Sequence, residues 1–139
     1  MDIKVNIKQI GKKKAKVSAM PFSIENQPHT VRELIKECVH TCVSEYNDRV
    51  RKSEQYRTLT EEDIQDMSEV GKIAFGINYG GKEADENKAL ENAIQSYEDG
   101  LYRIFIGEED AGEIESRIVL EKNSEVTFIR LSMLSGRMW

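Results

Sequence analysis

The sequence has few of the residues that build disulfide frameworks, metal centres or membrane spans. Its 139 residues include two cysteines, two histidines, two prolines and one tryptophan. Two cysteines are too few for the bridged framework of a small secreted domain, so we expect a reduced, cytoplasmic chain. No apolar run approaches the roughly 20 residues that a membrane-spanning helix needs. The opening segment MDIKVNIKQI lacks the apolar block of a signal peptide.

Basic residues are also in the minority. The net charge is −5 and the isoelectric point is about 5.2. General binding to nucleic acids or anionic membranes needs a concentrated basic face, so we expect neither as a partner. The one basic run consists of Lys12, Lys13, Lys14 and Lys16, and we interpret it as the solvated tip of a hairpin.

The cysteines and histidines do not combine into a metal or catalytic site. Cys38 and Cys42 are four residues apart in a helix-like stretch, so their Cβ vectors run parallel and a bridge is not expected. His40 lies two residues from each and points about 200° away on a helix. Two thiols fall short of a four-ligand zinc site. We therefore predict no metal, no cofactor and no enzymatic activity, with both cysteines in the core.

The amino-terminal part reads as a β-hairpin followed by a long helix. Ile3, Val5 and Ile7 alternate with polar residues, Gly11 marks a turn, and a second alternating stretch follows through Ala15, Val17 and Ala19. Thr30 and Glu33 form a capping box. From there to about Arg51 the apolar period is 3.6, which predicts a helix with one buried face: Val31, Leu34, Ile35, Cys38, Val39, Cys42, Tyr46 and Val50.

The carboxy-terminal part mixes one further helix with short strands. A short helix is predicted around Ile64, and the glycine-rich segment 71–82 is either an irregular loop or a short strand. Its GGK lacks the spacing of a phosphate loop. Residues 85–99 are helical, with Gly100 as the C-cap. A strand is expected from Leu101 to Gly107, and a final strand runs through Val126 and Phe128, with Leu131 also inward. Ile118 and Leu120 between them are expected in a very short strand or a turn of helix.

The order of these elements resembles the ubiquitin-like β-grasp superfamily. The segment LYRIFIGEEDAGEIESRIVLEKNSEVTFIRLSML is similar to ubiquitin's third strand, glycine turn, short segment and last strand. LEKNSEVTFI is similar to the matching end of the sulfur carriers. The resemblance implies an α+β domain over residues 1–139, in which a mixed sheet wraps one long helix. Residues 1–52 and 101–135 would form the core, 53–100 an insertion, and 136–139 a projecting tail.

That resemblance implies how the protein works. In the family the first and last strands pair in parallel, so the carboxyl terminus projects from the sheet. Ubiquitin and the sulfur carriers end in two glycines, whereas this sequence has Gly136 followed by Arg137, Met138 and Trp139. We therefore expect a non-catalytic module that binds a protein partner. The alternatives are a modifier or sulfur carrier activated after carboxy-terminal trimming, and an enzyme with its site in the glycine-rich segment.

Two surfaces are candidates for partner binding. One is the outer sheet face at Ile104 and Ile129, which the resemblance places where ubiquitin has its apolar patch. Helix 85–99 is the rival occupant of that face. The other is the tail from Gly136 to Trp139, because tryptophan is favoured at the centres of interfaces. The tail has the alternative of folding back onto the core.

Deleting Arg137–Trp139 tests the tail. We expect the deletion to abolish capture of the partner and to leave the free energy of unfolding nearly unchanged, because an anchor outside the core adds little to stability. Capture from extracts of the native source and chemical denaturation measure the two effects. A large loss of stability would show a structural tail instead. The intact mass of the native protein separates the alternatives: a binding module should end at Trp139, whereas a carrier should lack at least three carboxy-terminal residues.

Overall fold

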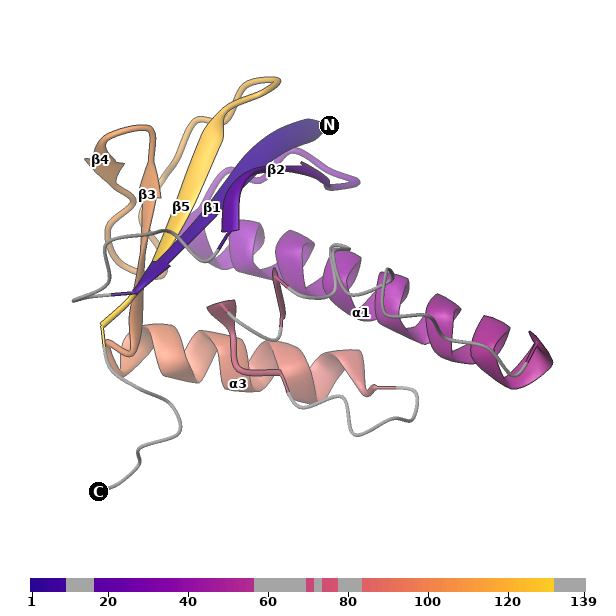
Figure 1. The fold of residues 1–139 in the computed structure, drawn as a ribbon. Coiled ribbons are helices and arrows are strands. Elements are labelled where there is room, and N and C mark those ends of the chain that lie inside the picture. Colours follow the sequence, from indigo (N-terminus) through magenta and orange to yellow (C-terminus); the bar gives the residue numbers. More distant parts are fainter. Residues whose placement is uncertain (10–16, 57–69, 72–73, 78–83, 132–139) are drawn as a thin grey trace.

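The structure is a computed structural model, and it describes residues 1–9, 17–56, 70–71, 74–77 and 84–131. These residues form an α+β protein with a five-stranded mixed sheet and two helices, which confirms the predicted class (Figure 1). The predicted short helix around Ile64, most of the glycine-rich segment and the tail 136–139 lie outside the described residues. No helix in the described part is long and apolar enough to cross a membrane.

The sheet has the order β2-β1-β5-β3-β4. Its strands and the two helices are β1 (Asp2–Gln9), β2 (Val17–Ser23), α1 (Val31–Tyr56), α3 (Glu86–Glu98), β3 (Tyr102–Ile106), β4 (Glu109–Asp110) and β5 (Glu125–Arg130). β1 and β5 pair in parallel, and the other neighbouring strands pair antiparallel. The parallel pairing that the sequence led us to expect between the first and last strands is therefore present.

The central strand pair supplies the middle of the core. Val5 lies opposite Val126, and Ile7 lies opposite Phe128. All four side chains are fully buried. Since side chains alternate along a strand, the residues between them, such as Thr127, point to the other side of the sheet.

In the second strand, of the alternation expected through Ala15, Val17 and Ala19, only the Ala19 side chain lies within the described part of the structure. Phe22 is the buried side chain, opposite Ile3, whereas Ala19 is exposed. The register of the hairpin shifts between Val5 and Ile7. There Ala19 adopts a φ of 50°, and its N–H donates to Asn6 Oδ1 at 2.6 Å. Such an irregularity changes which side chains of a strand face the core.

Helix α1 buries the face that its period predicts. Its buried apolar residues are Val31, Leu34, Ile35, Cys38, Val39, Cys42, Val43, Tyr46 and Val50. The Glu33 N–H donates to Thr30 Oγ1 at 3.2 Å, as in a capping box. The Glu33 carboxylate, however, accepts the N–H of His29 at 2.8 Å. The helix ends at Tyr56, later than the expected end near Arg51.

Helix α3 is closed at both ends by local hydrogen bonds. Asp85 caps its start by accepting the N–H groups of Asn87 and Lys88. At its end the Gly100 N–H donates to Tyr97 O and the Leu101 N–H to Ser96 O, which is the Schellman pattern. Gly100 has the positive φ of 78° that this motif requires. The predicted helix 85–99 and its glycine C-cap are confirmed.

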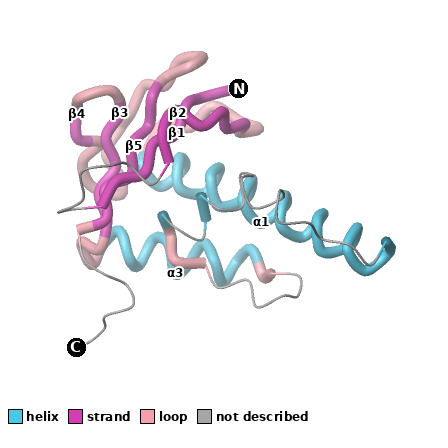
Figure 2. Tube along the Cα trace, viewed as in Figure 1, coloured by secondary structure: helices cyan, strands magenta, loops and turns pink. Residues whose placement is uncertain are grey.

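Both helices lie on the same side of the sheet (Figure 2). Asn47 of α1 exchanges two hydrogen bonds with the backbone of Ala84, just before α3. At the other end of α3, the Tyr102 hydroxyl donates to Ala93 O at 2.7 Å. The inward side chains of β1, β3 and β5 therefore face the helices, and the other side of the sheet carries no described helix.

One continuous apolar cluster joins the sheet to the segment predicted as an insertion. Buried residues of that segment belong to the same cluster as the strands: Val70, Ala74, Phe75, Ile77, Ala89, Ala93 and Tyr97. The Phe75 ring packs edge-on against Phe128 at a centroid distance of 5.2 Å and against Tyr102 at 5.6 Å. These residues are therefore part of the core and do not form a separate peripheral unit.

Two expectations for the carboxy-terminal part need adjustment. Ile118 and Leu120 are buried in the core cluster, but their segment forms neither a strand nor a helix. An isolated bridge joins Arg117 to Thr30, and the Ile118 N–H donates to His29 O at 3.0 Å. Leu131 was expected inward and is 38% exposed. Because Val126 and Phe128 point inward, the alternation places Leu131 on the same side as Thr127 and Ile129.

The two faces of β5 give a stability test. Phe128→Ala is expected to lower the free energy of unfolding by about 3–5 kcal/mol, because it removes a fully buried ring from the core. Ile129→Ala should cost less than about 1 kcal/mol, since that side chain is only half-buried. Urea denaturation measures both. Equal losses in the two variants would contradict the assigned faces.

Candidate interaction surfaces

The structure separates the two isoleucines that were expected to share a surface. Ile104 is fully buried and points toward the helices, so its predicted place on the outer face is wrong. The register explains this: Ile104 lies opposite Phe128, whereas Ile129 lies opposite Arg103. Ile129 is half-buried on the outer side. Helix 85–99 does not cover that side, because it packs on the inner one.

We call the side of the sheet opposite the helices the open face. Its apolar residues are Phe105 and Ile129, both half-buried. Thr127 lies opposite Phe105, and Lys8 lies opposite Ile129. The charged residues along the described part of this face include Asp2, Lys4, Lys8, Arg103, Asp110 and Glu125. The open face is thus a small apolar pair surrounded by charges of both signs.

Asn6 holds the open face together. Its side-chain amide donates to Glu125 Oε1 at 2.9 Å and to Thr127 Oγ1 at 3.2 Å. Its carbonyl oxygen accepts the Ala19 N–H. Asn6 is one of few buried polar side chains among the described residues, and these bonds satisfy most of its capacity. They link β2, β1 and β5 and keep this part of the face rigid.

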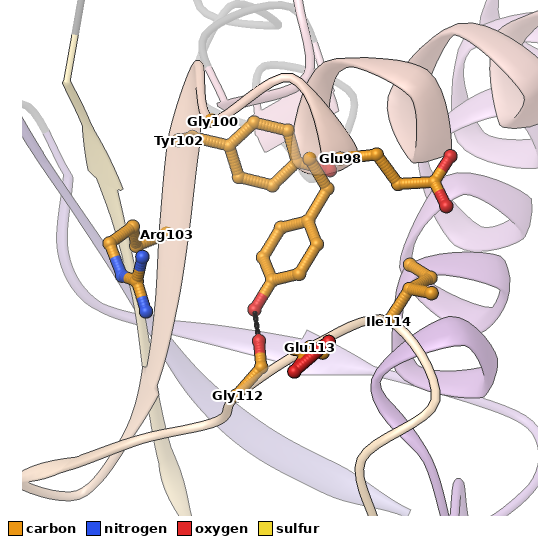
Figure 3. A pocket seen from close by; sticks show the side chains of 8 residues that line it. Glu98, Gly100, Tyr102, Arg103, Gly112, Glu113 and Ile114 are labelled. Carbon is orange, nitrogen blue, oxygen red and sulfur yellow. Dashed lines mark hydrogen bonds between the residues drawn. The ribbon is translucent and has the colours of Figure 1, made fainter.

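A cleft lies beside the open face, at the edge of β3 (Figure 3). Its volume is about 460 Å³. Tyr97, Tyr102 and Ile114 supply its apolar lining, and Glu98 and Glu113 supply carboxylates. The cleft therefore forms between the end of α3, the start of β3 and the segment after β4.

Hydrogen bonds fix the wall of the cleft at Gly112. The Tyr97 hydroxyl donates to Gly112 O. Burial, followed by the negative charge of Asp110, raises the pKa of Tyr97, so the phenol stays protonated and remains a donor. Gly112 has a φ of 96°, and a Cβ there would meet Ser116 Oγ at 2.6 Å. Only glycine fits this position without strain.

Arg103 connects the open face to the cleft, and its charge is already neutralised. Its Nε donates to Asp110 Oδ2 at 2.8 Å, and Asp110 Oδ1 accepts the Gly112 N–H at 2.8 Å. Partial desolvation opposes ionisation of Asp110, but the bonds from Gly112 and Arg103 outweigh it and lower the pKa of this carboxyl. Asp110 therefore stays charged and paired.

The cysteines and His40 lie apart from both surfaces. Cys38 and Cys42 are both fully buried, which confirms their predicted place in the core. Burial, and then the charge of Glu37, raises the pKa of Cys38, so its thiol stays neutral and is a poor nucleophile. Within the described ranges, no group of three or more His, Cys, Asp or Glu side chains could hold a metal ion.

His40 instead bridges three segments. Its Nε2 lies 2.7 Å from Glu25 Oε2 in the connector, and its Nδ1 lies 3.0 Å from the carboxylate of Glu86 at the start of α3. Desolvation acts to lower the pKa of His40, but hydrogen bonds with Glu25 and Glu86 prevail and raise it above 6.5. Protonated His40 therefore ties the connector, α1 and α3 together.

Sequence reasoning missed Phe105, Arg103 and the cleft. The signal for the first two was present in LYRIFIG, where Arg103 is the only charged residue. Placing Arg103 outward also places Phe105 outward and Ile104 inward, because faces alternate. The cleft had no such signal, because its residues come from three separate elements. Gly136, Arg137, Met138 and Trp139 lie outside the described residues.

Stability should depend on pH through His40. Because its pKa is raised in the folded protein, its contribution is complete below the unfolded value of about 6.5 and is lost as the pH rises through the folded value. His40→Gln should remove this component, at a cost below about 1 kcal/mol for so exposed a cluster. Urea denaturation at several pH values measures it. An unchanged pH profile in His40→Gln would contradict the assignment.

Comparisons with known protein families, with curated proteins and with solved structures found no match. No relative therefore supplies a function for this chain. Its own surfaces, the open face and the cleft, are the features that can indicate one.

Proposed function

We propose that this protein is a non-catalytic protein-interaction module built on a ubiquitin-like β-grasp core. The strand order β2-β1-β5-β3-β4, with its parallel central pair, supports that framework. So does the long helix α1 packed across one face of the sheet (Figure 1). A fold does not fix a function, so the proposal depends on the surfaces that this framework presents.

The observation that carries the proposal is the pair Phe105 and Ile129 on the open face. Apolar side chains that are half-buried on an otherwise charged sheet gain further burial when a partner covers them. The charged residues around them, such as Lys4 and Lys8, suit the polar rim of an interface. Asn6 keeps the strands below them in fixed positions, so little ordering is needed on binding.

The tail Gly136–Trp139 belongs to the same proposal. Leu131 follows Ile129 by two residues, and its N–H donates to Leu101 O at 3.0 Å beside the sheet. Eight residues follow Leu131, a length that spans at most about 28 Å when extended. A partner seated on the open face is therefore within reach of Arg137, Met138 and Trp139.

Charge substitution at Ile129 tests the open face. Ile129→Lys is expected to reduce capture of the native partner at least tenfold, because a buried unpaired charge would be left in the interface. Quantitative mass spectrometry of proteins captured from the native source measures this loss. The free energy of unfolding should change little, since Ile129 lies outside the core.

Val119→Lys is the matched control. Val119 is 78% exposed and lies between β4 and β5, in a segment that belongs to no strand of the sheet. The same change in size and charge there should leave capture unaltered. Capture retained in Ile129→Lys, or lost equally in both variants, would overturn the role of the open face.

A further inference from the structure

We propose that the cleft at the edge of β3 receives a partner segment that carries lysine or arginine next to an apolar side chain. The inference rests on the proposed role as an interaction module, and it names the chemistry of what that module binds. It does not need the open face to take part. Shape, charge and the rigidity of the cleft each support it.

The shape suits one long side chain and its neighbour. A volume of about 460 Å³ exceeds that of a single residue and lies within the range of small-ligand sites. Tyr97 and Tyr102, both buried, form the floor of the cleft, and the half-buried Ile114 adds an aliphatic wall. Lysine and arginine pack their methylene stems along such surfaces while the charged end stays near water.

The charge selects a cation. Glu98 and Glu113 are exposed, and within the described chain neither has an ion-pair partner. Arg103 also lines the cleft, but its guanidinium pairs with Asp110, and Arg32 pairs with Glu115. A basic partner side chain would therefore meet two uncompensated carboxylates. The same carboxylates repel phosphate, which disfavours a nucleotide or nucleic acid in this place.

The cleft is held open by backbone features on both sides. Gly112 is fixed by the Tyr97 hydroxyl and by Asp110. Gly100 closes α3 in the Schellman motif, and a Cβ built there would meet no atom within 4 Å. Because both residues are glycines, no side chain at either position fills the cleft. A preformed cleft lowers the entropic cost of binding.

A pair of short peptides tests the site on the full chain. The probe is acetyl-Leu-Arg-Leu-amide, and its control is acetyl-Leu-Glu-Leu-amide. We expect the arginine peptide to produce saturable NMR shifts at the amides of Tyr97, Gly100, Gly112 and Ile114, with at least tenfold weaker binding of the glutamate peptide. Equal binding of both peptides, or no saturable shift at these amides, would overturn the inference.

Two double variants with the same net charge separate local from general electrostatics. Glu98→Gln with Glu113→Gln should weaken binding of the arginine peptide at least tenfold. Glu91→Gln with Glu121→Gln removes two exposed carboxylates elsewhere and should change it less than twofold. If both double variants weakened peptide binding equally, the peptide would be held by general charge attraction, and the proposal of a specific site would be overturned.

Two further measurements distinguish the cleft from the open face and a partner segment from the chain's own tail. Capture of the native partner by Ile129→Lys and binding of the arginine peptide by the wild type are separate readouts, so failure at the open face and failure at the cleft are distinguishable. Deletion of Arg137–Trp139 should leave peptide affinity unchanged. Tighter peptide binding after this deletion, with shifts at the same amides, would show that the chain's own tail fills the cleft and would overturn a partner segment.

Discussion

The parallel pairing of β1 with β5 is the constraint on which the rest of the structure depends. It joins residues more than 100 positions apart and places Val5, Ile7, Val126 and Phe128 in one buried layer. The sheet extends outward from this pair, with β2 beside β1, β3 beside β5, and β4 beside β3. Because faces alternate along each strand, this single register decides which side chains enter the core and which remain available to a partner.

The placement of both helices on one side of that sheet then creates the two candidate surfaces. α1 and α3 cover the inner face, and Tyr102 bonds to the backbone of α3 through its hydroxyl. The opposite face stays free of described helices and carries Phe105 and Ile129. At the β3 edge, the end of α3 and the turn at Gly112 leave the cleft between them. Both candidate surfaces therefore lie where the described helices do not cover the sheet.

Several elements could be predicted because their signals are local. Thr30 with Glu33 marks the start of α1, and Gly100 marks the end of α3, since caps depend on neighbouring residues. The face of Ile104 was assigned wrongly for a reason that is equally physical. β3 has apolar residues on both faces, so alternation alone is ambiguous, and a shift of one residue exchanges the faces. Only the charged Arg103 indicated which face of β3 points outward.

The sequence by itself determined the α+β class, the two helices, the buried cysteines and the inward residues of β1 and β5, because period and capping act over a few residues. Tertiary structure alone decided the side of the sheet on which α3 packs, and the cleft. It also brought Glu25 and Glu86 to His40 from separate segments. Such arrangements depend on contacts between distant residues, and no local pattern records those contacts.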